Sequence, residues 1–367
     1  MTPSDTRPIQ RLPVEQAFSA ELERLGAVDR GARPAGWRLS PRMVRAFVLG
    51  DASLGITRKF HGDDPLVERC IVTLMSNRGL LLVGEPGTAK TMLSELLSAA
   101  ISGRSTCTLQ GTAGTTTDQM LYGWNYALLL AEGPSPRALV RGPIHTAMEL
   151  GTICRIEEIT RVQPEIQDCL IGILSDRVLH VPELEGTPSN VFAATGFNVL
   201  ATANLRDRGV HELSSALKRR FHFETVRPLQ DKKLEMQLVK HQTDTLLASA
   251  GIDIALPPDV IDLLVTAFHD LRTGVTAEGT VVEKPTAVMS SAEAVAVGYA
   301  ACLDAHWLGN GDVGGEHVVR QLVGTVLKDN QDDGKKLRHW FEVVVKSRAQ
   351  RDPQWRRAFT VRREVDR

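Results

Sequence analysis

The sequence predicts an α/β fold built on a parallel sheet and followed by an all-helical region. Strand-like apolar runs alternate with helical patterns between residues 66 and 202, and a glycine-rich turn joins the first strand to a helix. Strand signals almost vanish after residue 228. Strands that alternate with helices are typical of a parallel sheet covered by helices on both faces.

Length and composition limit the classes of protein. The chain has 367 residues and a formal charge of −1, from 43 Lys and Arg against 44 Asp and Glu. Roughly 100–200 residues per domain predicts two or three domains. The charge balance argues against a nucleic-acid or membrane-surface binder. No apolar run approaches the roughly 20 residues that span a bilayer, and residues 1–16 lack a secretory signal.

The cysteines indicate a reducing compartment. They are odd in number and scattered, and no two of them form a C-x-x-C pair. This pattern disfavours a disulfide framework or a zinc site and fits reduced thiols. We therefore expect a cytoplasmic protein without a membrane partner.

Composition shifts divide the chain into three parts. Residues 1–38 are rich in Pro, Arg, Gly and Glu, so we expect a partly flexible N-terminal extension. Residues 39–228 carry the alternating pattern and form the predicted α/β core. Residues 229–367 show helical periodicity in segments between 234 and 347, so we expect an all-helical part here.

The expected elements follow in chain order. Helices have apolar residues at i, i+3 and i+4, whereas buried strands are short continuous apolar runs. In the core we expect a helix at 66–75, a strand at 79–83, a helix at 90–101, strands at 105–109 and 152–156, helices at 144–150 and 164–174, a hairpin from 178–181 and 191–193, and a strand at 197–202. Helices are then expected at 234–247, 258–271, 290–303, 317–327 and 337–347.

The turn after the first strand carries the strongest motif, Gly84-Glu85-Pro86-Gly87-Thr88-Ala89-Lys90-Thr91. The phosphate-binding template is G-x-x-x-x-G-K-[ST], and only its second glycine differs, being Ala89 here. Backbone N–H groups of such a loop and the following helix N-terminus bind phosphate oxygens. Lys90 would bind the β- and γ-phosphates of ATP, and Thr91 would ligate Mg²⁺. The alternative is a plain turn between strand and helix.

Polar residues follow two other predicted strands. Glu157 and Glu158 end the run at 153–156, and Asn204 ends the strand at 197–202. Carboxylates there could hold Mg²⁺ and polarise water, and an amide could orient that water. Arg220, in Lys218-Arg219-Arg220-Phe221, could stabilise charge that develops on a γ-phosphate, including that of a neighbouring subunit. Each of these residues also has a structural alternative, as a cap, a turn residue or a solvated basic run.

Over roughly residues 40–300 the chain resembles the AAA+ ATPases, and specifically the MoxR-type group. The resemblance rests on the loop at 84–91, on Gly142-Pro143-Ile144, and on Glu157-Glu158-Ile159-Thr160-Arg161 followed by Pro164 and Gln167. The strand at 199–204 resembles the sensor-1 strand, residues 213–221 resemble the L-P-E-A-x-x-D-R-F segment more loosely, and the predicted hairpin occupies the place of the pre-sensor insertion. The resemblance implies an AAA+ P-loop NTPase core with an all-α lid.

The resemblance also implies roles for single residues. The loop at 84–89 binds nucleotide, Lys90 and Thr91 bind phosphate and Mg²⁺, and Glu157 takes the metal-side acidic position. Glu158 is the base that activates water, Asn204 is sensor 1, and Arg220 is the arginine finger offered to the next protomer. Arg161 faces that same junction between subunits.

Three departures from the family pattern affect this assignment. Glu157 replaces the usual Asp, so its carboxylate reaches about one methylene further. Arg155 places a charge in a strand that is expected to be buried, so it needs an acidic partner, and Glu157 is a candidate. Ser290-Ser291-Ala292 occupies the place of the family's sensor-2 segment and has no arginine, so Lys284 or Arg272 would have to substitute for it.

The leading functional expectation is a Mg²⁺-dependent ATPase that forms a ring, by resemblance a hexamer, and remodels or matures a partner protein. By resemblance, that partner carries a von Willebrand A-type domain. One alternative is an ATP-switched assembly module with negligible turnover, motivated by Arg155, Glu157 and Ala292. A nucleic-acid motor is disfavoured because the chain lacks a basic–aromatic stripe.

Overall fold

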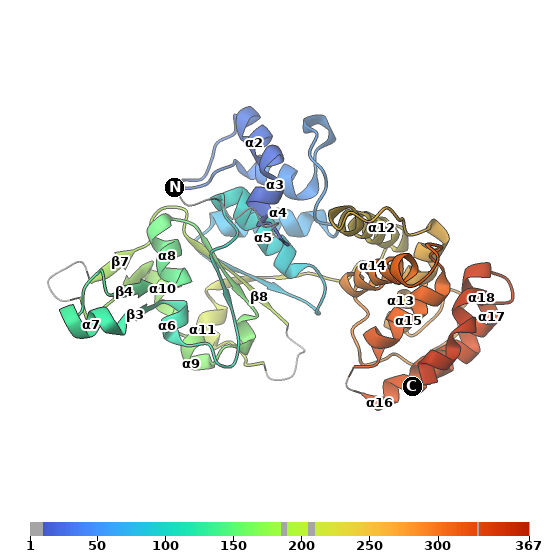
Figure 1. Ribbon diagram of the computed structural model, residues 1–367. Helices are drawn as coiled ribbons and strands as arrows, with labels where there is room; N and C mark the ends of the chain where they lie inside the picture. The colour runs from blue at the N-terminus through green and yellow to red at the C-terminus, as the bar shows by residue number, and fades with distance from the viewer. Residues whose placement is uncertain (1–9, 185–188, 205–209, 329, 367) are drawn as a thin grey trace. The chain divides into compact units, whose positions relative to one another are not determined.

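The computed structural model describes residues 10–184, 189–204, 210–328 and 330–366 (Figure 1). The chain divides into two compact units. The α/β unit comprises residues 1–84 and 89–226, and the helical unit comprises residues 227–367 with residues 85–88. No helix in the described ranges is long and apolar enough to cross a membrane.

A five-stranded parallel sheet forms the centre of the α/β unit, in the order β2-β5-β8-β1-β9. Its strands are β1 (Gly79–Val83), β2 (Thr108–Gln110), β5 (Ile153–Glu157), β8 (Asn198–Ala203) and β9 (Phe221–Thr225). The parallel α/β fold predicted from the sequence is therefore confirmed. The expected strand at 105–109 is shorter and begins at Thr108, because the Ser105 carbonyl accepts a hydrogen bond from the Arg155 side chain.

Helices cover both faces of this sheet, as Figure 1 shows. Successive side chains of a strand point to opposite faces. Leu80 and Leu82 accordingly join one buried cluster with residues of α3, α4 and α5, whereas Leu81 and Val83 join another with residues of α8 and α10. The helices of this unit are α1 (Val14–Ala17), α2 (Ser19–Val28), α3 (Pro41–Leu49), α4 (Asp64–Met75), α5 (Lys90–Ser102), α6 (Thr117–Met120), α7 (Tyr126–Glu132), α8 (Pro143–Leu150), α9 (Pro164–Gln167), α10 (Leu170–Asp176) and α11 (Ser215–Lys218), with 3₁₀ turns η1 (Ala52–Leu54) and η2 (Ile159–Arg161).

The N-terminal segment contributes to the core of the α/β unit. Leu22 and Leu25 on α2 are buried in the same cluster as α3, α4 and α5. Within the segment expected as an extension, 1–38, residues 1–9 lie outside the described residues. The described remainder therefore packs on the sheet's helical layer through apolar contacts.

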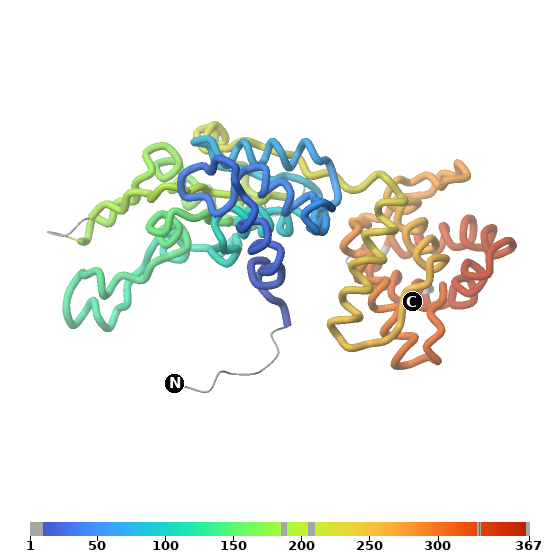
Figure 2. Tube along the Cα trace, turned by 90° about the horizontal axis from the view of Figure 1, so that it is seen from above, coloured from blue at the N-terminus to red at the C-terminus, as the bar shows by residue number. Residues whose placement is uncertain are grey.

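Two antiparallel ribbons lie side by side at one end of the α/β unit in both Figure 1 and Figure 2. One pairs β3 (Tyr122–Trp124) with β4 (Leu139–Arg141), and the other pairs β6 (Val178–His180) with β7 (Asn190–Phe192). The second ribbon confirms the hairpin predicted from the sequence. Tyr122 and Trp124 pack against the buried Leu139 and Val181 of the two ribbons, which supports a packing role for these aromatic side chains.

The helical unit has its own buried core, to which α12, α13, α14, α15, α16 and α18 all contribute. Its elements are α12 (Lys232–Ser249), α13 (Pro258–Thr273), α14 (Ser291–Trp307), α15 (Gly315–Val326), α16 (Gln331–Trp340), the π-helix η3 (Phe341–Val345), α17 (Lys346–Arg348), α18 (Pro353–Thr360) and the 3₁₀ helix η4 (Arg362–Asp366). The helical character predicted after residue 228 is confirmed, and a capping box of Ser290 with Glu293 begins α14.

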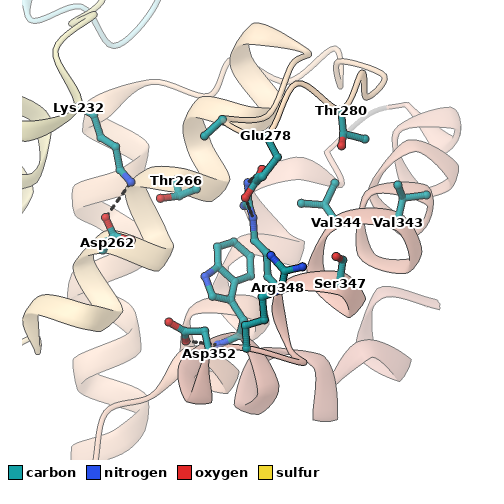
Figure 3. A pocket seen from close by; sticks show the side chains of 13 residues that line it. Lys232, Asp262, Thr266, Glu278, Thr280, Val343, Val344, Ser347, Arg348 and Asp352 are labelled. Atoms are coloured by element: carbon teal, nitrogen blue, oxygen red, sulfur yellow. Dashed lines mark hydrogen bonds and ion pairs between the residues drawn. The ribbon is translucent and has the colours of Figure 1, made fainter.

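A pocket of about 310 Å³ lies within the helical unit (Figure 3). Arg348 lines it, with its guanidinium 4.6 Å from the centre of the Trp355 ring. Its nitrogens lie 2.7 Å from carboxylate oxygens of both Asp270 and Glu278. The hydrogen bond from Arg348 lowers the pKa of Glu278 to about 2. The charge of Arg348 is thus balanced inside the unit, and the pocket presents no excess of cations.

Candidate functional site

The glycine-rich turn, residues 84–89, joins β1 to α5 as the sequence predicts. Gly87 has φ of 74° and Ala89 has φ of 65°, both in the left-handed region. A non-glycine residue in that region costs roughly 1–2 kcal/mol. The position of the second template glycine therefore requires a left-handed backbone, and Ala89 adopts this backbone at a cost in strain. Backbone strain of this kind concentrates at ligand-binding sites.

Lys90 and Thr91 begin α5 directly after this turn. Lys90 is buried, and its Nζ donates a hydrogen bond to the Gly84 carbonyl at 3.1 Å. The Thr91 hydroxyl donates to Glu157 Oε2 at 2.9 Å, so the helix start and the end of β5 meet. The structure therefore brings the predicted phosphate-side and metal-side residues of the α/β unit together.

Glu157 is the centre of a buried polar network. Its Oε1 accepts from Ser94 at 2.7 Å and its Oε2 from Thr202 at 2.8 Å, in addition to Thr91. Burial alone would raise the pKa of this carboxyl, but Arg155 and the three hydroxyl donors hold it below its ordinary value. Glu157 is thus an ionised carboxylate, which is the form that binds a cation.

Arg155 finds the acidic partner that the sequence required. Its Nη2 lies 2.6 Å from Glu157 Oε1, and the same nitrogen is 3.7 Å from Glu95. The Arg155 side chain is only 4% exposed, and it also donates to Ser94 and to the Ser105 carbonyl. The predicted pairing with Glu157 is therefore confirmed, and it occupies one carboxylate oxygen of the proposed metal ligand.

Glu158 and Asn204 lie together at the carboxyl ends of β5 and β8. The Asn204 Nδ2 donates to Glu158 Oε1 at 2.7 Å, and the Glu158 backbone N–H donates to the Thr202 hydroxyl at 3.1 Å. Glu158 has φ of 55°, so its backbone is also left-handed. Arg161 Nε lies 3.5 Å from Glu158 Oε2, which places this predicted residue beside the proposed base.

Arg220 lies at the other edge of the sheet. Arg220 directly precedes β9, and Phe221 of β9 is in register with Gly79, the first residue of β1. Lys90 follows the last residue of β1, at the opposite end of the strand. Five strand residues at about 3.3 Å each separate these two edges by about 16 Å. The structure therefore does not bring Arg220 to the loop of its own chain. Arg220 donates instead to Ser175 and to the Ala216 carbonyl.

Lys284 and Arg272 belong to the helical unit. The Lys284 side chain lies against Gly274, where a Cβ atom would stand 2.8 Å from the Lys284 Cε. Arg272 Nη2 is 2.7 Å from the carboxylate of Glu235, which is fully buried and also accepts from His269 and Ser291. Arg272 is thus committed to an ion pair inside its own unit.

Sequence reasoning missed the two hydroxyl side chains that hold Glu157. Ser94 lies three residues after Thr91, which places both on one face of α5. Thr202 lies two residues before Asn204, so both side chains point to the same face of β8. These spacings are visible in the sequence and could have predicted both contacts.

Comparison with known proteins agrees with this geometry. Residues 79–221 match the family model of the AAA domain (dynein-related subfamily), and residues 233–366 match that of the YehL-like AAA+ ATPase C-terminal domain. The chain is 49% identical over 345 residues to YehL of Escherichia coli strain K12, covering 94% of this chain and 95% of that protein. The chain belongs to the YehL-like AAA+ ATPase family.

Further similarities cover part of the sequence or concern the fold alone. A Staphylococcus haemolyticus protein is 34% identical over 146 residues, which cover 40% of this chain and 54% of that protein. Crystal structures of NtrX from Brucella abortus with ADP and with ATP align with TM-scores of 0.51 and 0.50, at 12% and 13% identity. The alignments cover 83% and 81% of this chain and 64% and 60% of NtrX. At this level of identity, they show that this YehL-like protein shares the AAA+ fold and nothing more.

Proposed function

We propose that this YehL-like protein hydrolyses ATP in a Mg²⁺-dependent reaction, as a MoxR-like machine of the cytoplasm. One observation carries the proposal: Thr91 bonds to Glu157 at 2.9 Å and Asn204 bonds to Glu158 at 2.7 Å. The Thr202 hydroxyl, which contacts Glu157 and the Glu158 backbone, links the two pairs. In this proposal residues 39–228 form the nucleotide-binding core and residues 229–367 form the lid. The loop at 84–91 would hold the phosphates.

The residues of the site have distinct chemical tasks. Glu158 would accept the proton of the attacking water, and Asn204 would position both that water and the carboxylate. Glu158 is paired with Asn204 in this structure, so the base must turn toward water before it acts. Arg161, 3.5 Å from Glu158, would supply positive charge at the same edge.

The side chains present fit Mg²⁺. Thr91 Oγ1 and Glu157 Oε2 are hard oxygen ligands 2.9 Å apart, and the Glu157 carboxylate is ionised. Mg²⁺ in nucleotide sites is held by one or two protein oxygens together with substrate phosphates and water. Thr91 and Glu157 would hold the ion, which would neutralise the charge of the phosphates.

The proposal includes assembly between copies of the chain. Arg220 lies about 16 Å from the carboxyl edge of the sheet, by strand rise, so it would act on the nucleotide of a neighbour. We therefore propose a ring, most simply a hexamer, in which ATP turnover remodels a partner protein that carries a von Willebrand A-type domain. Lys284 would take the sensor-2 role in the lid, because Arg272 is paired with Glu235.

The Arg155–Glu157 ion pair favours a second candidate function. Arg155 occupies Glu157 Oε1 at 2.6 Å, which would weaken the hold of this carboxylate on Mg²⁺. Slow turnover would follow, and ATP would then act as an assembly switch. Retained ATP binding with negligible hydrolysis by the wild type would identify this case.

We expect Lys90→Ala to weaken the binding of a fluorescent ATP analogue at least tenfold. Lys90 is buried and is the single lysine in the sequence motif 84–91. Loss of its ammonium group removes a charge-assisted contact to the phosphates. Equilibrium titration followed by fluorescence anisotropy measures this effect. Lys335→Ala is the matched control, since Lys335 is an exposed lysine paired with Asp332. Equal affinities of Lys90→Ala and the wild type would remove the loop from the proposal.

A further inference from the structure

A second pocket, of about 480 Å³, lies wholly within the α/β unit. Four arginines from three segments line it, and the residues around it are Asn77, Arg78, Leu174, Ser175, Arg177, Arg219 and Arg220. The lining contains no carboxylate. A pocket with four guanidinium groups and no acidic residue carries a strong positive potential.

None of these arginines is neutralised within the described chain. Other arginines of the protein pair with carboxylates, as Arg348 does with Asp270 and Arg357 with Glu316. No carboxylate of the described residues lies within ion-pair distance of Arg78, Arg177 or Arg219. Arg220 likewise contacts only a hydroxyl and a carbonyl among the described residues. Among the residues that the structure describes, the group therefore lacks a counter-anion, and an external anion would supply it.

Arg177 is the most firmly held of the four. It ends α10 with φ of 56°, a left-handed conformation that is strained for arginine. Its guanidinium lies 5.6 Å from the centre of the Phe197 ring, and its Nη2 donates to the Asn77 carbonyl at 2.6 Å. Its Nη1 reaches the Phe197 carbonyl at 3.5 Å, so several of its five N–H donors are left for a ligand.

Burial of Arg177 without an anion has an energetic consequence. Desolvation by burial lowers the pKa of Arg177, and no carboxylate in the described part of the chain compensates for it. The half-buried Arg177 guanidinium meets two carbonyls and the Phe197 ring but no carboxylate of the described residues, so its burial costs hydration that no ion pair offsets. Binding of an anion would relieve that cost, which is the expected signature of a ligand site and not of a structural ion pair.

The position of the pocket excludes the nucleotide of the same chain. Asn77 and Arg78 directly precede β1, and Arg219 and Arg220 directly precede β9, so the pocket lies at the amino edge of the parallel sheet. The phosphate loop follows β1 at the carboxyl edge, about 16 Å away by strand rise. Any phosphate that reaches these arginines must therefore come from outside the chain.

We propose that Arg177 and Arg78, with Arg219, form a polyphosphate-binding pocket that clamps the terminal phosphates of a nucleotide held by a neighbouring copy, beside Arg220. This inference rests on the proposed function for the origin of the phosphates. It goes beyond a single arginine finger, because four unneutralised guanidinium groups match the charge and the several oxygens of a β,γ-diphosphate end. Planar guanidinium groups bind phosphate oxygens bidentately.

The binding test is independent of ATP turnover. Inorganic tripolyphosphate is titrated by calorimetry into Lys90→Ala, whose own loop is disabled, and into Lys90→Ala combined with Arg177→Ala or with Arg78→Ala. We expect each added substitution to weaken binding at least fivefold, and higher salt to weaken it further. Arg78 is exposed, so its substitution tests the pocket without disturbing packing. Unchanged affinity in both double variants would overturn the proposal, even if the wild type hydrolyses no ATP.

A mixing test identifies the source of the phosphates. Lys90→Ala lacks a working loop but keeps the pocket, and Arg177→Ala lacks a working pocket but keeps the loop. We therefore expect each variant alone to lose at least nine-tenths of the ATPase activity. In a head-to-tail ring formed from a random equal mixture of the two variants, about one junction in four joins an intact loop to an intact pocket. Recovery to about that fraction of wild-type activity supports clamping between copies. If activity recovers when Lys90→Ala is mixed with Arg220→Ala but not when it is mixed with Arg177→Ala, Arg220 acts alone and the proposed clamp is contradicted.

Arg137→Ala is the control for both tests. Arg137 is an exposed arginine that is paired with Glu132, so its removal changes the net charge equally without touching the pocket. An equal effect of Arg137→Ala would reduce the result to general electrostatics and would contradict the proposal. If the wild type has no ATPase activity under any condition, the proposed function fails while the tripolyphosphate test still decides whether the pocket binds polyphosphate.

Discussion

Replacement of Glu158 by Gln is expected to lower the rate of ATP hydrolysis by about 10²- to 10⁴-fold, the usual contribution of a general base. Gln keeps the size of the side chain and an oxygen that can accept from Asn204 Nδ2, but it cannot take a proton from water. ATP binding should therefore persist within about twofold. Phosphate release measured under saturating ATP, with binding of a fluorescent analogue beside it, checks both parts.

Glu165→Gln is the matched control for this substitution. Glu165 is an exposed residue of α9, seven positions further along the chain, and it has no place in the site. Its replacement should leave hydrolysis unchanged. Comparable rates for Glu158→Gln and the wild type would show that Glu158 is not the base, or that the wild type does not turn over ATP.

Replacement of Arg155 by Leu is expected to lower the free energy of unfolding of the α/β unit by about 3–5 kcal/mol, the usual effect of breaking a buried ion pair. Glu157 would remain as a buried carboxylate without its cation, and Ser94 and the Ser105 carbonyl would each lose a donor. Urea denaturation followed by circular dichroism measures this loss.

Arg45→Leu provides the control for the effect of burial. Arg45 pairs with Glu68 at 2.7 Å, but both side chains are about half exposed, so we expect a loss below about 1 kcal/mol. If Arg155→Leu destabilises the protein no more than Arg45→Leu does, the Arg155–Glu157 pair is not a structural element of the site.

The stability of this network should also depend on pH. The folded-state pKa of Glu157 lies below its ordinary value, despite the opposing effect of burial, because of Arg155 and the hydroxyl donors. Its contribution is therefore fully present above the unfolded pKa of about 4.3 and is lost as the pH falls through the lower folded pKa. In Arg155→Leu burial acts without the guanidinium, so this contribution should shrink.

Much of the fold follows from short-range signals in the sequence. The run Gly79–Val83 and the turn after it predict β1, the loop and α5, because continuous apolar runs and glycines have direct local meaning. The helical unit was equally predictable in outline. Its last elements, α18 and η4, were not expected, because the polar segment after residue 350 owes its order to packing of Trp355 in the helical core.

The site was predictable where it depends on strand ends. Residues that follow parallel strands gather at one sheet edge, and Glu158 and Asn204, both predicted as site residues, lie 2.7 Å apart there. The left-handed backbone at Ala89 also matches the position where the phosphate-loop template has glycine. Ser94 and Thr202 could have been found from helical and strand spacing.

The arginine pocket could not be predicted from the sequence. Arg78, Arg177 and Arg219 are separated by about a hundred and by about forty residues along the chain, and each one alone is typical of a solvated surface. Only the parallel register, which places the starts of β1 and β9 together, brings these segments to one edge. The lack of acidic partners is likewise a property of three-dimensional packing.

Steady-state ATP hydrolysis measured across protein concentration, for the wild type and Arg220→Ala, tests the central claim that the ATPase site is shared between copies. Arg220 lies at the amino edge of the sheet, whereas Lys90 lies at the carboxyl edge. The specific activity of the wild type should rise with concentration as copies assemble, and Arg220→Ala should be inactive at every concentration. A constant specific activity that Arg220→Ala retains would show that each chain hydrolyses ATP alone.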